Sequence, residues 1–457
     1  MLQKNLGFNK VGILALLSFL AITCITFFKS AMELEDAEQA YFSQWLRWGY
    51  DDQPPLYTWL QYAVNSVFGV SKFSFSVLRG IIFATILLML FALAKKLALN
   101  RIKAELSVLS LVLVPVFIDF TFRRLSHTTL LCLVILSTYL IIQNLINKKT
   151  IWNYMLFGAI IGIGILSKYN YVLFLGAFFL AAFLDLSIRK IILHPLIMVT
   201  LIVSALVVMP HFYWLLGPQG YLETLEQSVA LKLESNLEKE TLFLTPIYSY
   251  IKSIFRLVSV LVITLAPFFL LKKIKFVKQK VGWLTKLFLA QLIVLLFFFL
   301  ILNVQKVEVR WLLPLFLPFS ILLISNIHFK SVEKWSKYGF MIFLTMIFIQ
   351  VVRTPIEKLL HIPSSIHFGF NPIANKLKEN YSDKLWVLPN VTYGGNIRLL
   401  YPEREIFSKD DFSIPKSKIP KNTVEVIFED DVMPYKIIRD SIGSFGKEKE
   451  NLFFLVN

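Results

Sequence analysis

The chain has 457 residues, of which 56% are hydrophobic and 17% are charged, and its mean hydropathy is +0.65. An ordinary soluble domain has about 25% charged and about 45–50% apolar residues. The composition therefore excludes a soluble globular protein, a disordered chain and a disulfide scaffold. The formal net charge of +17 would fit nucleic-acid binding if the basic residues shared one surface. In short loops between apolar runs they indicate membrane orientation instead.

The apolar residues form eleven runs long enough to cross a bilayer, which takes roughly 17–25 residues. The first run follows two lysines and lacks a small-residue cleavage site, so we expect an uncleaved anchor and not a signal peptide. Cys24 and Cys132 lie within apolar runs, and we interpret both as core residues. The predicted spans lie near 11–28, 75–94, 105–122, 125–146, 151–167, 169–188, 191–216, 251–271, 283–303, 311–328 and 337–353.

The basic residues between these runs predict the orientation. A cytoplasmic N-terminus places Lys or Arg in every cytoplasmic loop, as the positive-inside rule requires. Most of the positive charge therefore reflects orientation in a cytoplasmic (inner) membrane, and we expect no nucleic-acid partner. The cytoplasmic basic residues are Lys4, Lys10, Lys95, Lys96, Arg101, Lys103, Lys148, Lys149, Arg189, Lys190, Lys272, Lys273, Lys275, Lys278, Lys280, Lys330, Lys334 and Lys337.

The composition changes after the last span. We therefore expect a transmembrane unit at 1–354 and an extracytoplasmic domain at 355–457, where charged residues and prolines become frequent and no run could span. About 100 residues suffice for one modest core. The patterns there predict a small α/β domain. It would contain strands at Lys384–Pro389, Val424–Phe428 and Leu452–Val456 and an amphipathic helix at Ile373–Tyr381.

The first outer loop, 29–74, contains the densest group of carboxylates. Four acidic residues lie within Glu33–Glu38, and an aromatic-rich stretch follows. Leu56–Phe68 has the apolar spacing of an amphipathic helix, and Pro54 and Pro55 suit its start. We expect two short helices lying in the membrane interface. A solvated acidic loop that enforces orientation is the alternative interpretation of the carboxylates.

Several basic residues lie on the outer side, where the orientation rule disfavours them. Arg123 and Arg124 form a turn between two spans, and Lys168 and Arg310 lie near the outer ends of others. Guanidinium groups suit phosphate binding, whereas snorkelling toward head groups is the alternative. Together with the acidic loop they suggest one outward-facing pocket for a phosphorylated, lipid-linked substrate. His127 and His211, taken alone, are more typical of structural histidines.

The run Glu35–Tyr41, followed by Trp45–Leu56, resembles the first outer loop of the GT-C glycosyltransferases that use polyprenyl-phosphate sugars. It resembles particularly family 39, which contains protein mannosyltransferases and the aminoarabinose transferases of lipid A. The resemblance extends over roughly residues 10–330. Further similar motifs follow in order at Gly162–Tyr169, Met209–Trp214 and Glu308–Pro314.

The resemblance implies a polytopic GT-C fold. It also implies sugar transfer, with inversion, from a polyprenyl-phosphate donor to a lipid, glycan or protein at the outer face. A first-loop carboxylate acts as a base at the acceptor hydroxyl or holds a divalent cation such as Mg or Mn. That role falls on Glu38 or, in the competing register, on Asp36. The donor phosphate would lie near Gln53, Lys168 and Arg310, and near the Arg123–Arg124 turn. The substrate pocket would include Tyr41, Tyr50, Asp52, Tyr169 and His211.

Two departures from the family pattern affect the site. Relatives usually carry Asp in the first-loop position where this chain has Glu38, and a second Asp where it has His127. His127 thereby becomes a candidate base or ligand. Two other functions stay open: a lipid-linked-sugar flippase, which would need charges near the bilayer midplane, and an inactive relative that acts as a scaffold.

Overall fold

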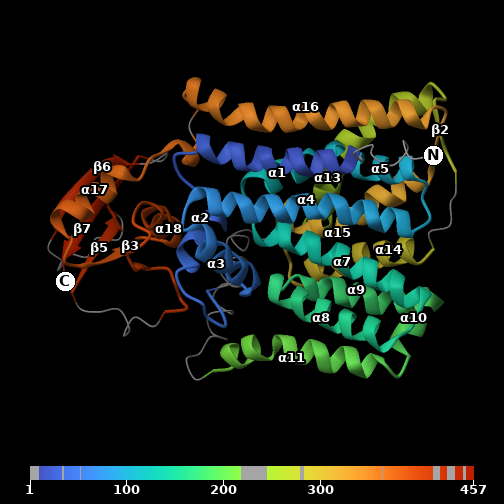
Figure 1. Ribbon diagram of the computed structural model, residues 1–457, viewed down its shortest axis with the longest axis horizontal. Coiled ribbons are helices and arrows are strands. Elements are labelled where there is room, and N and C mark those ends of the chain that lie inside the picture. Colours follow the sequence, from blue (N-terminus) through green and yellow to red (C-terminus); the bar gives the residue numbers. More distant parts are fainter. Residues whose placement is uncertain are drawn as a thin grey trace.

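The structure is a computed structural model that describes residues 10–32, 35–51, 53–217, 244–277, 282–362, 364–414, 422–429, 438–445 and 449–456. It has two parts: a bundle of long helices, and a small domain of helices and strands at one end of that bundle (Figure 1). The short helices of the first outer loop lie between the two parts (Figure 1).

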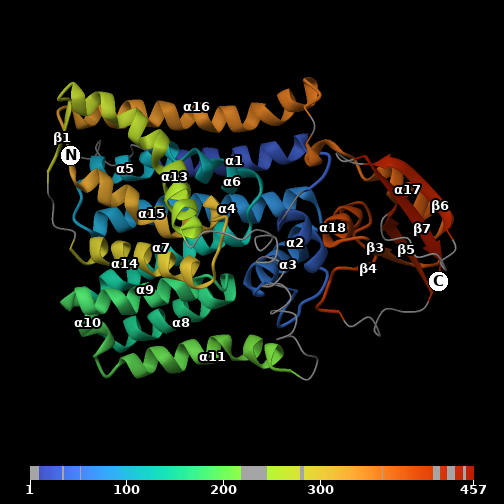
Figure 2. The same cartoon turned by 180° about the vertical axis from the view of Figure 1, so that it is seen from behind.

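The bundle is built from helices that run side by side along the long axis of the molecule, with α13 crossing one face (Figure 2). Two short strands, β1 (Ile274–Phe276) and β2 (Ile327–Phe329), pair antiparallel at the end far from the small domain. The helices are α1 (Lys10–Phe28), α4 (Lys72–Lys96), α5 (Arg101–Leu109), η1 (Ser110–Leu113), α6 (Pro115–Arg123), α7 (His127–Asn147), α8 (Ile151–Ser167), α9 (Tyr171–Leu184), α10 (Leu186–Ile192), α11 (Ile197–Leu215), α13 (Thr245–Leu270), α14 (Gly282–Ile301), α15 (Val309–Ser325) and α16 (Val332–Leu359).

Every predicted span falls on one of these helices or on a bent pair of them. By length and composition, seven helices in the described part of the chain could cross a membrane, or nine if each bent pair is one span. The pairs bend by 79° between η1 and α6 and by 118° between α9 and α10. Pro115 begins α6, and the Asp185 carboxylate caps α10. The apolar segments in α8 and α15 are shorter, so the total of eleven spans stays a prediction.

Glycines allow close helix contacts in the bundle. A Cβ at Gly158 would lie 2.5 Å from the carbonyl oxygen of Thr200, and one at Gly162 would lie 2.6 Å from the Cβ of Val207. These two glycines are four residues apart on α8, so they form one face against α11. Small residues at this spacing let membrane helices pack closely.

The small domain contains a five-stranded mixed sheet in the order β4-β3-β5-β7-β6. β3 pairs parallel with β4 and β5, whereas β7 pairs antiparallel with β5 and β6. The three predicted strands and the predicted helix are present, and β4, β6 and α18 are additional. The elements are α17 (Asn371–Asn380), β3 (Leu385–Leu388), α18 (Val391–Leu400), β4 (Ile406–Ser408), β5 (Thr423–Phe428), β6 (Ile438–Phe445) and β7 (Glu450–Val456).

The first outer loop forms the two predicted short helices, α2 (Glu35–Phe42) and α3 (Leu56–Phe68). The backbone N–H groups of Ser30 and Ala31 donate to the carbonyl of Ile366, 2.8 and 3.0 Å away. The side-chain amide of Asn396 in α18 accepts from the N–H of Met32 at 2.8 Å and donates to its carbonyl at 2.9 Å. These contacts join the small domain to the acidic loop.

Candidate functional site

Asp36 lies in a buried polar cluster at the end of the bundle that faces the small domain. Its carboxylate pairs with the guanidinium of Arg79 and accepts a 2.9 Å hydrogen bond from the hydroxyl of Ser126. The ammonium of Lys29 is 4.0 Å away. Asp36 and Arg79 are only 5% and 3% exposed, and a buried carboxylate and guanidinium require each other's charge. The first outer loop is thereby tied to α4 and to the start of α7.

Glu35, the neighbouring carboxylate, caps α7. It accepts hydrogen bonds from the backbone N–H groups of Ser126 at 2.5 Å and His127 at 2.9 Å. These N–H groups at the helix N-terminus have no partner within the helix, and the helix dipole favours a negative charge there. The ammonium of Lys168 lies 3.5 Å from Glu35 on another side. Glu35 therefore connects α2 to α7 and to the end of α8.

The two carboxylates have pKa values that shift in opposite directions. Burial disfavours the charge of Glu35, but Lys168, the His127 ring and the two backbone N–H groups outweigh it, so the pKa of Glu35 is lowered. Burial also disfavours the charge of Asp36, and Arg79, Lys29 and Ser126 offset it only in part, so the pKa of Asp36 is raised. Divergent pKa values in adjacent acids are a feature of sites that use one as a base and the other as a fixed charge.

His127 lies fully buried at the first position of α7. Its Nε2 is 2.9 Å from the side-chain nitrogen of Gln39, and its Nδ1 is 3.4 Å from the carbonyl oxygen of Ser167. Gln39 in turn accepts a 2.8 Å hydrogen bond from Thr58. A neutral ring with its proton on Nδ1 satisfies both contacts. In this arrangement His127 links α2, α7 and the end of α8.

The predicted basic residues are differently placed. Lys168 reaches the cluster and also donates to the hydroxyl of Thr128 at 2.9 Å. Arg123 is 1% exposed and pairs with Glu357 of α16 at 3.0 Å.

The three other residues predicted at the donor phosphate are half-buried. Arg124 lies at the end of α6, Gln53 lies before α3, and Arg310 lies in the first turn of α15. Their roles at a donor phosphate stay predictions.

The predicted pocket residues fall into two groups, and Asp52 lies outside the described residues. Tyr41 and Tyr50 are 0% and 1% exposed, and the hydroxyl of Tyr41 donates to Asp411 of the small domain at 3.0 Å.

The second group contains Tyr169 and His211. The hydroxyl oxygen of Tyr169 is 3.0 Å from Nε2 of His211, and Nδ1 of His211 is 2.7 Å from the carbonyl oxygen of Trp48. Tyr41 thus lies in a domain contact, whereas Tyr169 and His211 connect the turn between α8 and α9 with α11 and the first outer loop.

Several members of the cluster are absent from the sequence prediction. Arg79 lies within the predicted span 75–94, and an ionisable residue within a span is itself a sign of function. Glu38, the first choice for the base, is half-buried on α2, whereas Glu35 and Asp36 are buried. Lys29, Gln39 and Ser126 carry no sequence signal that separates them from ordinary loop residues.

The carboxylates do not form a fitting site for a divalent cation. Magnesium and manganese prefer a set of oxygen ligands with net negative charge. Here three cationic side chains, those of Lys29, Arg79 and Lys168, contact the two carboxylates. In the part of the chain that the structure describes, no three His, Cys, Asp or Glu side chains gather as a metal site. The charge balance of this cluster is therefore complete without a divalent cation.

The fold defines the class of protein. The structure superposes on ArnT from Cupriavidus metallidurans bound to undecaprenyl phosphate with a TM-score of 0.64, covering 97% of both chains at 10% identity. The apo structure of the same protein gives a TM-score of 0.52 at 12% identity, again over 97% of both chains. The chain is a multi-pass membrane protein with the GT-C fold and a small sheet at its C-terminal end.

The sequence comparisons match part of the chain to known glycosyltransferases. Residues 52–214 match the family model described as dolichyl-phosphate-mannose-protein mannosyltransferase, so the predicted resemblance to GT-C glycosyltransferases is confirmed. The lipopolysaccharide core galacturonosyltransferase RgtA of Rhizobium johnstonii is 33% identical over 188 residues, 41% of this chain and 38% of that protein. RgtB of the same organism is 32% identical over 189 residues, 40% and 37% of the respective chains. The match thus spans under two fifths of these relatives.

Proposed function

We propose that this chain is a glycosyltransferase of the cytoplasmic membrane that moves a sugar from a polyprenyl-phosphate donor to an acceptor at the outer face. One observation carries the proposal: two buried carboxylates of the first outer loop face three cationic side chains at one end of a GT-C bundle. ArnT, which shares the fold, binds undecaprenyl phosphate. The relatives RgtA and RgtB are galacturonosyltransferases of the lipopolysaccharide core.

The proposed reaction needs a base and a stabilised leaving group. The oxygen of the acceptor hydroxyl attacks the anomeric carbon from the side opposite the phosphate, so the configuration inverts. The bond from the anomeric carbon to the phosphate oxygen breaks, and the polyprenyl phosphate leaves with the bonding electrons. A carboxylate of α2 accepts the hydroxyl proton. Asp36 suits this role through its raised pKa, and Glu38 is the competing candidate.

Cationic side chains would stabilise the negative charge that develops on the leaving phosphate. Lys168 is the candidate nearest to the carboxylates, and Arg124, Arg310 and Gln53 are the further candidates. Arg123 is held by Glu357, so its contribution would be to position the turn that carries Arg124. Tyr169 and His211 would form part of the wall of the substrate pocket.

The proposed placement in the membrane follows from the loop charges. All eleven apolar segments cross the bilayer, the N-terminus is cytoplasmic, and the small domain lies outside. The transmembrane unit comprises 1–354 and the outer domain 355–457. The transferred group is a hexosyl or pentosyl residue, and the acceptor is a lipid, a glycan or a protein.

The test is sugar transfer by the full chain in proteoliposomes. The donors are undecaprenyl-phosphate-linked galacturonic acid, mannose or aminoarabinose, and the acceptors are envelope lipids and glycans analysed by mass spectrometry. Asp36→Asn or Glu38→Gln should lower the rate by about 10²–10⁴-fold, the range for a lost general base. Glu333→Gln, at the start of α16, removes one exposed carboxylate far from the site and should leave the rate unchanged.

Three outcomes would contradict the proposal. Full transfer by both the Asp36 and Glu38 variants would overturn the site assignment. Movement of the labelled donor lipid across the bilayer without a covalent product would identify a flippase. Envelope glycans identical in cells with and without the protein would favour a scaffold.

A further inference from the structure

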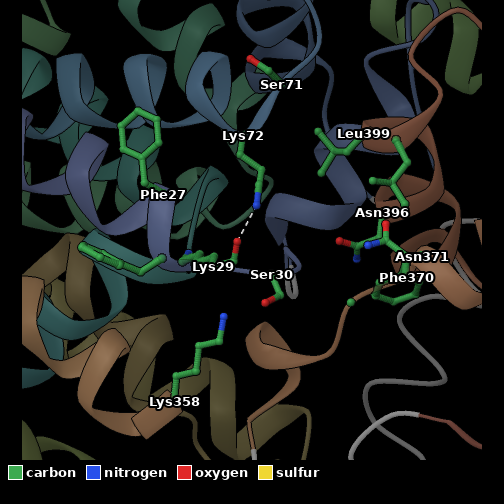
Figure 3. A pocket seen from close by; sticks show the side chains of 13 residues that line it. Phe27, Lys29, Ser30, Ser71, Lys72, Lys358, Phe370, Asn371, Asn396 and Leu399 are labelled. Carbon is green, nitrogen blue, oxygen red and sulfur yellow. Dashed lines mark hydrogen bonds between the residues drawn. The ribbon is translucent and has the colours of Figure 1, made fainter.

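A cavity of about 500 Å³ lies where the helical bundle meets the small domain (Figure 3). The bundle contributes the end of α1, the start of α4 and the end of α16. The small domain contributes the start of α17 and the end of α18. Lys29 separates this cavity from the candidate site: its carbonyl group lines the cavity side, whereas its ammonium lies 4.0 Å from Asp36. The cavity is therefore adjacent to the carboxylate cluster but distinct from it.

The cavity is basic. Figure 3 shows the ammonium groups of Lys72 and Lys358 directed toward the same space beside Ser30. Lys72 donates to the carbonyl of Lys29, and Lys358 forms no ion pair with any described residue. None of the thirteen described lining residues is acidic. Two like charges that share a space repel each other, and an anion between them would remove that repulsion.

The carboxylate next in sequence does not neutralise this cavity. Glu357 pairs with Arg123 at 3.0 Å and with Arg353 at 2.6 Å, so its charge is already matched inside the bundle. Lys358, one residue later on α16, points instead toward the cavity (Figure 3). Glu357 is therefore paired inside the bundle, and the ammonium groups of Lys72 and Lys358 stay available for an anionic ligand.

Part of the cavity lining is apolar and exposed. Phe27 and Phe28, at the end of α1, are 73% and 40% exposed, and Leu400 is 42% exposed. Both α1 and α16 are helices long and apolar enough to cross a membrane, so their adjoining ends lie where acyl chains meet head groups. Exposed aromatic and aliphatic groups beside lysines match a molecule with an apolar body and an anionic head.

We infer that this cavity binds the anionic head group of a membrane lipid, with its phosphate between Lys72 and Lys358 and its acyl chains against Phe27 and Phe28. A volume of about 500 Å³ accommodates one head group. The adjoining small-domain residues, including Asn371, provide polar groups on the opposite wall. The inference concerns lipid binding and holds whether or not the candidate site transfers sugar.

The test uses the full chain in phosphatidylcholine nanodiscs that contain a small fraction of phosphatidic acid with a photoreactive diazirine near its head group. After irradiation, peptide mass spectrometry locates the label. We expect label on the peptides that contain Ser30 and Asn371. Lys72→Met with Lys358→Met should lower this labelling about tenfold or more, since each lysine near a charged lipid contributes a substantial share of its binding.

Matched variants separate charge from folding. Lys72→Arg with Lys358→Arg keeps both charges and should retain the label. Lys334→Met with Lys337→Met removes the same charge from exposed positions at the far end of α16 and should leave labelling of the two peptides unchanged. Equal labelling in the doubly methionine-substituted cavity variant, or equal labelling by a photoreactive phosphatidylcholine, would overturn the inference. Loss of label on addition of millimolar inorganic phosphate would instead assign the cavity to free phosphate and also overturn it.

Discussion

Gly395 of α18 packs on the carbonyl oxygen of Ala37 in α2, so closely that a Cβ at residue 395 would lie 1.9 Å from that oxygen. Ala37 directly follows the two buried carboxylates. The small domain therefore determines the position of the helix that carries the candidate site. Arg398 adds a 2.7 Å hydrogen bond to the carbonyl of Ala40, farther along the same helix.

This contact predicts a large effect from adding one methyl group. Gly395→Ala should displace α2, lower the thermal unfolding midpoint and reduce sugar transfer at least tenfold, because a backbone carbonyl cannot move independently of its helix. Alanine favours helix over glycine by about 1 kcal/mol, so any loss of stability must come from the clash. Gly443→Ala in β6, where the nearest atom would be 3.5 Å away, is the matched control. Equal behaviour of the two variants would refute the positioning role.

A second prediction concerns the buried pair of Arg79 and Asp36. Arg79→Met leaves a buried carboxylate without its partner and should destabilise the protein by about 3–5 kcal/mol. Arg79→Met combined with Asp36→Asn removes both charges and should recover part of that stability without recovering transfer. Denaturant unfolding in detergent and the proteoliposome assay measure the two effects. Additive losses in the double variant would show that the two residues are not coupled.

The lowered pKa of Glu35 predicts a dependence on pH. A carboxyl whose folded pKa is below its ordinary value of 4.5 stabilises the fold above that value, and the stabilisation is lost as the pH falls through the folded pKa. Lys168→Met removes a cation that lowers this pKa, so the folded pKa moves back toward 4.5 and the stability lost on acidification should be smaller than in wild type. Thermal unfolding between pH 3 and pH 7 (roughly the range over which carboxylates titrate) compares the variant with wild type. Lys148→Met, at an exposed loop position, should leave the curve unchanged.

His127 provides a fourth prediction. Both of its ring nitrogens face partners, the amide of Gln39 and the carbonyl of Ser167. If the ring positions α2 and accepts no substrate proton, His127→Gln should keep transfer within about tenfold of wild type, far from the 10²–10⁴-fold loss for a general base. The pH profile of transfer should keep its shape. A loss comparable to that of Asp36→Asn would identify His127 as the base.

The sequence predicts the helical segments well because apolar runs of membrane length have few other structures available. It predicts three strands of the small domain because short runs of apolar residues, alternating with polar ones, are typical of strands with a buried face. It does not predict α18, whose Gly394 and Gly395 disfavour a helix in isolation and are needed only because α2 packs on them. Contacts between residues far apart in the chain decide that element.

The candidate site divides in the same way. The acidic loop is visible in the sequence, since four carboxylates within six residues are unusual next to a membrane span. Which of them is buried depends on partners 43 to 133 positions away: Asp36 meets Arg79, and Glu35 meets the start of α7 and Lys168. No periodicity in one segment encodes those pairings. Among the cluster residues absent from the sequence prediction, only Arg79 carries a signal in the sequence, because it is a charged residue inside an apolar run.

The packing of α18 on α2 has a consequence for biogenesis. The ribosome synthesises α2 (Glu35–Phe42) long before its supporting helix α18 (Val391–Leu400). The acidic helix therefore reaches its final position only after every intervening membrane segment has been inserted and the terminal domain has folded. Chains that stall during synthesis would therefore carry the two buried carboxylates on a helix without the packing that positions it.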